Sequence, residues 1–203
     1  MTCAQDGYCH VSGDTAACNA TLDGATPCDG ATCLKYAFVS SIPFDPSQGI
    51  TAADTLCDQD GNKLQPRGRY RALLSTSQQS AIQHVGADFS WVRSDRSAWA
   101  NSAQDLLDAK VLNKLDLDYQ GTVVDSTYVW SGSANAWEVS TDKAKDSCQD
   151  WSTNQSNDAC AVSALVGRTD RAATDSQGLN FFSFSSCHTC DDTLVRVYCL
   201  QVE

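Results

Sequence analysis

The number and placement of cysteines constrain this chain more than any other feature of its sequence. Its 203 residues include 11 cysteines and one methionine. Five cysteines lie within the first 33 residues, five lie from Cys148 to Cys199, and Cys57 stands between the two groups. A reducing cytosol would keep them as thiols, so we expect a secreted or cell-surface protein in an oxidising compartment. Because 11 is odd, at least one cysteine is free or joined to another molecule.

Charge and hydropathy narrow the range of partners. The net charge is −11, from 14 basic and 25 acidic residues. This balance argues against nucleic acid or an anionic membrane as the main partner. No stretch approaches the roughly 18 apolar residues of a membrane span. The sequence begins in polar residues without a recognisable signal peptide, so we expect the export signal to be missing from it.

Residues 1–34 are predicted to be a separate segment, stapled by disulfides. They contain Gly, Asp, Ala, Thr and Asn between the cysteines and almost no large apolar residues, so they cannot fold around a core. Two local disulfides are expected among five cysteines, with one left over: Cys3, Cys9, Cys18, Cys28 and Cys33. The leftover cysteine makes this segment the expected place for a disulfide-linked or homo-oligomeric assembly.

Residues 35–203 are predicted to form one α+β domain. A helix is expected from Thr51 to Gly61, with Thr51 as N-cap and Asp54 in a capping-box position, and a second helix or turn within 100–111. Short runs of β-branched and aromatic residues predict strands near 36–41, 68–75, 91–93, 123–124, 128–130, 180–184 and 194–199. Long polar loops join them, and such loops need disulfides and buried aromatic side chains to hold them.

The sequence shows no catalytic motif that we can identify. It contains three histidines but no Gly-x-Ser-x-Gly and no His-Glu-x2-His, and it lacks a glycine-rich phosphate loop. Cys187 and Cys190 have the spacing of a Cys-x2-Cys redox pair, but they precede a strand instead of opening a helix. We therefore predict structural disulfides here and a protein that is not an enzyme.

Two sets of residues are candidates for ligand contact. Trp99 and Trp137 lie in polar surroundings, where an exposed indole could stack on a ligand, whereas Trp130 and Trp151 are expected in the core. Four oxygen-bearing side chains in the loop after Cys148 lie within a span of nine residues and form a candidate calcium site: Asp150, Asn154, Asn157 and Asp158. The alternative is a solvated loop without a cofactor, since Asn, Asp and Ser are ordinary loop residues.

Five short motifs, taken in order, resemble a bacterial extracellular family related to the endostatin branch of the C-type-lectin-like fold. They are Ala53-Asp54-x2-Cys57, Tyr70-Arg71-Ala72-x-Leu74-Ser75, Val129-Trp130-Ser131-Gly132, Cys148-x2-Trp151 and Arg196-Val197-Tyr198-Cys199. The resemblance implies a fold with two helices, short, mostly antiparallel strands and long disulfide-pinned loops.

The resemblance also implies disulfide pairs. Cys57 would pair with Cys199 and Cys148 with Cys190, which leaves Cys160 and Cys187 as an extra bridge. The alternative exchanges the partners of Cys187 and Cys190. Calcium-dependent sugar binders of this fold carry Glu-Pro-Asn or Gln-Pro-Asp and Trp-Asn-Asp, which are absent here, so that mechanism is not carried over.

These observations lead to two expectations about function. The first is a non-catalytic extracellular binding or adhesion module that recognises a glycan or a surface protein through its long loops. The second is a structural or assembly component, linked through its cysteine-rich N-terminus.

Overall fold

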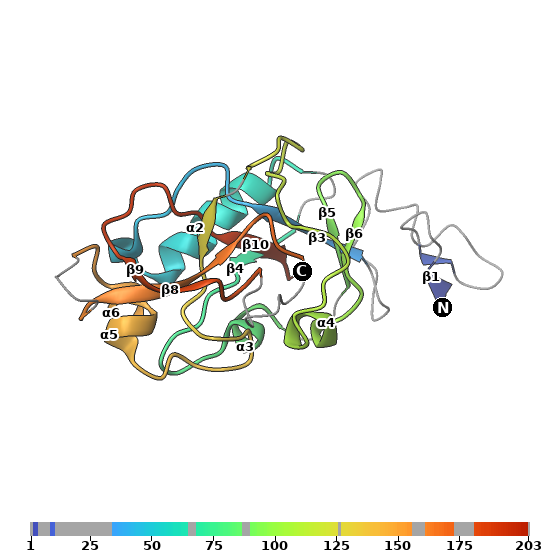
Figure 1. Ribbon diagram of the computed structural model, residues 1–203. Coiled ribbons are helices and arrows are strands. Elements are labelled where there is room, and N and C mark those ends of the chain that lie inside the picture. The colour runs from blue at the N-terminus through green and yellow to red at the C-terminus, as the bar shows by residue number, and fades with distance from the viewer. Residues whose placement is uncertain are drawn as a thin grey trace.

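The computed structural model describes residues 34–64, 68–86, 90–125, 127–155, 161–172 and 181–202, and two short strands near the N-terminus. These strands, β1 (Thr2–Cys3) and β2 (Cys9–His10), pair with each other in antiparallel fashion. The predicted disulfides of residues 1–34 lie outside the described side chains. From residue 34 onward the described chain is a mixed α+β fold, as predicted (Figure 1). No helix within these ranges is long and apolar enough to cross a membrane.

A five-stranded sheet joins the beginning and the end of this region. In spatial order its strands are β4 (Tyr70–Ala72), β10 (Tyr198–Gln201), β3 (Leu34–Val39), β5 (Ser90–Arg93) and β6 (Ala98–Ala100). Strand β10 pairs antiparallel with both neighbours, whereas β3 and β5 are parallel. The C-terminal strand is therefore internal to the sheet, with a hydrogen-bonded neighbour on each side.

The last strand is shorter than its apolar sequence predicts. We expected it from Leu194, but β10 begins at Tyr198. The preceding residues bond instead to an irregular segment after β3, where Ser40 N donates to Val197 O and Phe44 N to Val195 O. Pro43 in that segment has no N–H to give, which prevents a regular ladder there.

A second, antiparallel sheet packs beside the first. Its strands are β7 (Tyr128–Trp130), β8 (Ser163–Arg168) and β9 (Ser185–Thr189). Arg196 links the two sheets, since its N–H donates to Tyr128 O and its carbonyl accepts from Trp130 N. Two predicted strands are wrong. Val123 is 61% exposed and makes only an isolated bridge to Leu117, and residues 181–182 are buried in bends before β9.

Most helices are single turns. They are the 3-10 helix η1 (Pro46–Gln48) and the α-helices α2 (Ile50–Gly61), α3 (Ala81–Val85), α4 (Ala103–Leu107), α5 (Lys143–Asp146) and α6 (Cys148–Trp151). The predicted cap of α2 is wrong, because Gly49 and not Thr51 is the N-cap. Asp54 has no capping role, and its carboxylate instead accepts a hydrogen bond from Ala72 N in β4 at 2.9 Å.

Helix α2 covers the outer edge of β4, which is an edge strand. Asp54 and Asp58 accept from the outward N–H groups of Ala72 and Tyr70, the latter at 2.6 Å. A helix rises about 6 Å over four residues. A strand rises about 6.6 Å over two. The spacing of the two carboxylates along the helix therefore matches the spacing of two alternate N–H groups along the strand. On the same side of α2, Cys57 forms a disulfide with Cys199 of β10.

Side chains from the two faces of the main sheet form two hydrophobic clusters. Ala37, Val39, Tyr198 and Leu200 belong to one cluster, and Phe38 and Cys199 belong to the other, as strand alternation requires. The second cluster also contains Trp130 and Trp151, which confirms that both are core residues. It includes both described disulfides, Cys57–Cys199 and Cys148–Cys190, in the pairs that the resemblance implied.

The two disulfides should differ in their contribution to stability. Cys57 and Cys199 are 142 residues apart, and Cys148 and Cys190 are 42 apart. In the chain-entropy model these closures contribute about 5 and about 4 kcal/mol. We expect a Cys57→Ala/Cys199→Ala variant to lose about 1 kcal/mol more unfolding free energy than a Cys148→Ala/Cys190→Ala variant. Urea denaturation followed by tryptophan fluorescence measures both losses, and the reverse order would contradict this expectation.

Candidate functional site

A short irregular segment, residues 40–46, separates two grooves on the surface; we call it the Phe44 loop. Phe44 is buried, and its carbonyl accepts a hydrogen bond from the indole of Trp130 at 3.1 Å. Its N–H donates to Val195 O, so the loop is tied both to the core and to the C-terminal segment. The buried ring thus fixes a backbone whose flanking residues, Pro43 and Asp45, line both grooves.

The first groove, here the α2 groove, lies between the Phe44 loop and the outer side of helix α2. Its volume is about 330 Å³. Helix α2 contributes Ala52, Thr55, Leu56 and Gln59, which recur at the three- and four-residue spacing of one helical face. Gln48 of η1 also lines it. These lining side chains are aliphatic, hydroxyl or carboxamide groups.

The second groove, here the Cys190 groove, lies on the other side of the Phe44 loop. Its volume is about 190 Å³, and it is lined by residues 190–193 and by Asn154. Cys190 is held by its disulfide to Cys148. Asp192 accepts a hydrogen bond from Leu194 N and lies 2.8 Å from His188 Nε2. This groove carries more negative charge than the α2 groove, since Asp191 and Asp192 both line it.

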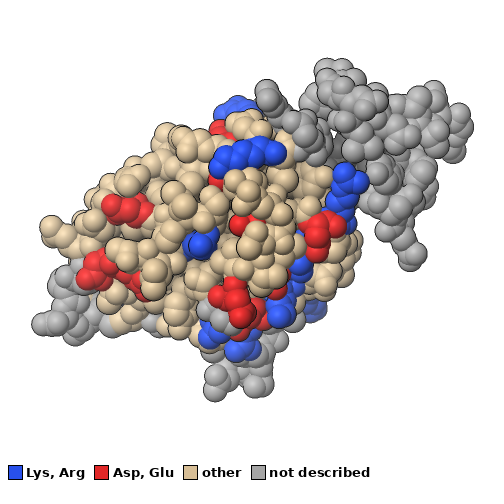
Figure 2. Space-filling model, turned by 90° about the horizontal axis from the view of Figure 1, so that it is seen from above, with Lys and Arg blue, Asp and Glu red and all other residues tan. Residues whose placement is uncertain are grey.

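Helix α2 directs its own carboxylates away from the α2 groove. Asp54 and Asp58 bond to strand β4, and Asp60, which is 1% exposed, accepts from the backbone and hydroxyl of Ser41. Among the described residues that line the groove, Asp45 is the one that carries a charge, and one of its oxygens accepts hydrogen bonds from Ser47 N and Oγ. Figure 2 shows wide uncharged areas on the face seen from above, between charged side chains that lie singly or in small clusters.

Two exposed aliphatic side chains adjoin the grooves. Ile42 is 57% exposed and lines the α2 groove, and Leu194 is 71% exposed and follows Thr193 of the Cys190 groove. Their segments are joined by the bond from Phe44 N to Val195 O. Exposed aliphatic groups beside a concavity are a common feature of binding surfaces.

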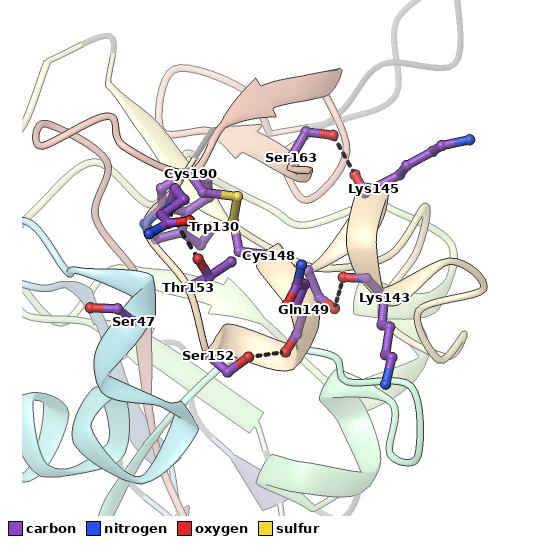
Figure 3. Close-up of a disulfide and its surroundings, with 12 residues drawn as sticks. Ser47, Trp130, Lys143, Lys145, Cys148, Gln149, Ser152, Thr153, Ser163 and Cys190 are labelled. Atoms are coloured by element: carbon purple, nitrogen blue, oxygen red, sulfur yellow. Dashed lines mark hydrogen bonds between the residues drawn. A yellow bond between two sulfur atoms is a disulfide. The ribbon is translucent and has the colours of Figure 1, made fainter. Parts of the chain in front are cut away.

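The segment labelled α6 is a left-handed turn, and it adjoins this surface through η1 and through the disulfide to Cys190. Cys148, Gln149, Asp150 and Trp151 all have positive φ, between 48° and 62°. Each non-glycine residue in this conformation costs roughly 1–2 kcal/mol, so surrounding contacts must hold it. Figure 3 shows the Cys148–Cys190 disulfide on one side of this turn and the hydrogen bond from Ser152 Oγ to Gln149 O on the other.

Two side chains of the left-handed turn bind a neighbouring loop. Asp150 accepts from Ser77 N and Ser77 Oγ, both at 2.6 Å, and the Trp151 indole donates to Ser75 O at 2.9 Å. Gly132 permits this approach, because a Cβ there would lie 2.5 Å from Ser75 O and 2.7 Å from the Trp151 ring. The turn also lies close to η1, where a Cβ at Gly49 would meet the carbonyl of Trp151 at 3.8 Å.

The two tryptophans predicted to contact a ligand have different positions. The prediction for Trp99 is wrong: it is fully buried and packs against Trp91, Phe181 and Tyr198. Its polar neighbours in sequence, Ser97 and Asn101, are misleading because they flank the three-residue strand β6, whose central residue packs into the core. Trp137 is 42% exposed, on a turn where Asn135 Oδ1 accepts from the N–H groups of residues 137 and 138. It remains a candidate contact.

The candidate calcium ligands and the third predicted disulfide are only partly described. Asp150 is directed toward Ser77, and both of its carboxylate oxygens accept hydrogen bonds: Oδ1 from Ser77 N and Ser147 Oγ, and Oδ2 from Ser77 Oγ. Asn154 is exposed beside the Cys190 groove. Asn157 and Asp158 lie outside the described residues, as does Cys160. Cys187 is disulfide-bonded, and its partner is not among the described side chains. Among the described residues, no group of three or more His, Cys, Asp or Glu side chains is placed to hold a metal ion.

The grooves were not predicted from the sequence, although one signal for them exists. In α2 the acidic residues share the face of Ala53 and Cys57, and the opposite face carries neutral residues. This inverts the usual amphipathic pattern, which places charges outward. It could have identified α2 as a helix whose carboxylates bind the protein itself.

A scan of the sequence against protein-family models finds no match, and neither does a search of the curated proteins.

Replacing Gln149 by glycine should stabilise the protein. Gln149 is exposed with φ 57°, a conformation that glycine adopts without the steric cost of a Cβ. We expect Gln149→Gly to raise the unfolding free energy by about 0.5–1 kcal/mol. The matched control Gln59→Gly, at an exposed right-handed position in α2, should lower it by about the same amount. Urea denaturation measures the unfolding free energy of both variants. A lower unfolding free energy for Gln149→Gly than for the unaltered protein would contradict the left-handed turn.

Proposed function

We propose that this protein is a non-catalytic extracellular binding module with a C-type-lectin-like fold, which recognises a glycan or a surface protein through its loops. The observation that carries the proposal is the pair of grooves around the Phe44 loop, with Ile42 and Leu194 exposed beside them. Loops held on a disulfide-braced scaffold can present such a surface without the mobility that weakens binding.

The pairing of the first and last strands of residues 34–202 supports the assignment of the fold. Strands β3 and β10 pair at the centre of one sheet, and Cys57–Cys199 ties the first long helix to the last strand. Every motif that carries the resemblance also has a structural task. Trp130 and Trp151 form an edge-to-face pair in the core, with ring centres 6.1 Å apart, and Gly132 lets Trp151 approach.

The surroundings of the described histidines support a role without catalysis. His84 Nε2 lies 2.9 Å from Asp54 and His188 Nε2 lies 2.8 Å from Asp192. A hydrolase of the Ser–His–Asp type would also need a nucleophile on the other ring nitrogen. Among the described residues, neither imidazole has a side-chain hydrogen bond other than the one to its carboxylate. Both pairs tie elements together: α2 to α3, and β9 to the loop that follows it.

Two aspartate substitutions test whether this surface binds. Ile42→Asp and Leu194→Asp should each abolish most of the binding to a surface polymer or protein, because each places a charge beside a groove and removes apolar contact area. Leu112→Asp is the matched control, since Leu112 is 51% exposed at a distant position after α4. Solid-phase binding to chitin, cellulose, peptidoglycan, collagen and fibronectin measures the effect.

Three results would contradict the proposal. One is that none of these polymers or proteins is retained. Another is that Leu112→Asp weakens binding as much as Leu194→Asp does, which would place the site elsewhere. The third is hydrolysis of a polysaccharide in the same assay, measured by released reducing ends, which would replace a binding function with an enzymatic one.

A further inference from the structure

We propose that the α2 groove binds an uncharged saccharide, an inference that rests on the binding function proposed above and names its ligand. The protein carries a net charge of −11, yet helix α2 turns Asp54, Asp58 and Asp60 toward the protein. The groove on its other face presents neutral groups from the helix, together with Asp45 from the Phe44 loop. A cationic ligand would be drawn to more acidic surfaces, and an anionic ligand would be repelled by the whole molecule.

The polar groups of the α2 groove suit hydroxyl-rich ligands. Within the described part of the chain, the carboxamides of Gln48 and Gln59 make no hydrogen bond to the protein, so each offers donors and an acceptor to a ligand. Thr55 Oγ1 donates to Thr51 O at 2.8 Å, which leaves its lone pairs free to accept. Asp45 retains one carboxylate oxygen beyond the one that caps η1. Hydroxyl groups, which both donate and accept, match this mixture.

The apolar groups of the groove suit the other surface of a sugar ring. Ile42, Ala52 and Leu56 line the same groove and contribute aliphatic contact area. Sugar rings carry C–H groups on their faces and hydroxyl groups on their edges, so they need both kinds of contact together. The volume of about 330 Å³ lies at the lower end of the roughly 300–1,000 Å³ typical of small-molecule sites, which favours one or two rings.

Nuclear magnetic resonance of the side-chain amides tests the assignment directly. We expect lactose, maltose, cellobiose or N,N′-diacetylchitobiose to shift the NH₂ signals of Gln48 and Gln59 with saturation in the millimolar range, as befits a small open site. N-acetylneuraminic acid and glucuronic acid should leave them unchanged at the same concentrations. The NH₂ signal of Gln120, an exposed glutamine outside the groove, is the internal control.

A steric variant tests the location. Thr55→Trp would fill the α2 groove and should weaken saccharide binding by at least about tenfold. Thr51→Trp is the matched control, because Thr51 is an exposed threonine of the same helix that does not line the groove. If Thr55→Trp does not fold, Gln48→Ala and Gln59→Ala replace it, since both residues are exposed, one at the end of η1 and the other in α2, where alanine is well tolerated.

The outcomes separate this assignment from the proposed function. If none of the four disaccharides shifts either glutamine signal, the saccharide assignment is wrong. It is also wrong if the shifts occur only near Trp137, or if Thr55→Trp binds as the unaltered protein does. Retention of collagen or fibronectin that Leu194→Asp abolishes would, in those cases, leave the binding module intact with a protein ligand. Failure of every surface assay would overturn both.

Discussion

The attachment of helix α2 to the edge of the main sheet is the interaction on which the rest of the structure depends. It consists of the Cys57–Cys199 disulfide and of two carboxylates, on Asp54 and Asp58, that accept hydrogen bonds from strand β4. An exposed edge strand is a liability because its N–H groups can pair with another chain, and here charged acceptors satisfy them. The same contacts fix the outer face of α2, which becomes one wall of the α2 groove.

A second set of contacts, around the left-handed turn, holds the loops in place. The left-handed turn at residues 148–151 would not persist by itself, since its four positive φ values are costly for residues with a Cβ. The Cys148–Cys190 disulfide connects it to the segment after β9, and the Asp150 carboxylate and the Trp151 indole connect it to the loop that contains Ser75 and Ser77. Because Cys190 also lines the second groove, the contacts that hold the turn also position that part of the surface. The same residues therefore stabilise the turn and position part of the proposed binding surface.

The two grooves differ in a way that bears on recognition. The α2 groove presents carboxamides, a hydroxyl and aliphatic groups, with Asp45 as its charged residue. The Cys190 groove is smaller and carries Asp191 and Asp192. A ligand long enough to cross the Phe44 loop would therefore meet a neutral surface and then an acidic one. Such a difference in charge would favour a ligand with one neutral end and one end that suits acidic groups over a ligand that is charged along its whole length.

Sequence alone was sufficient for the coarse properties of this protein. The disulfide-rich, α+β character followed from cysteine placement and from short β-branched runs, and Trp130 and Trp151 were correctly expected in the core. The burial of Trp99 and the exposure of Val123 were decided by the tertiary structure, because strand pairing, not local hydropathy, selects which face of each segment is covered. The direction of the α2 carboxylates was decided in the same way. A periodic sequence shows that one face of a helix differs from the other, but only its neighbour, here an edge strand with unpaired N–H groups, determines which face turns inward.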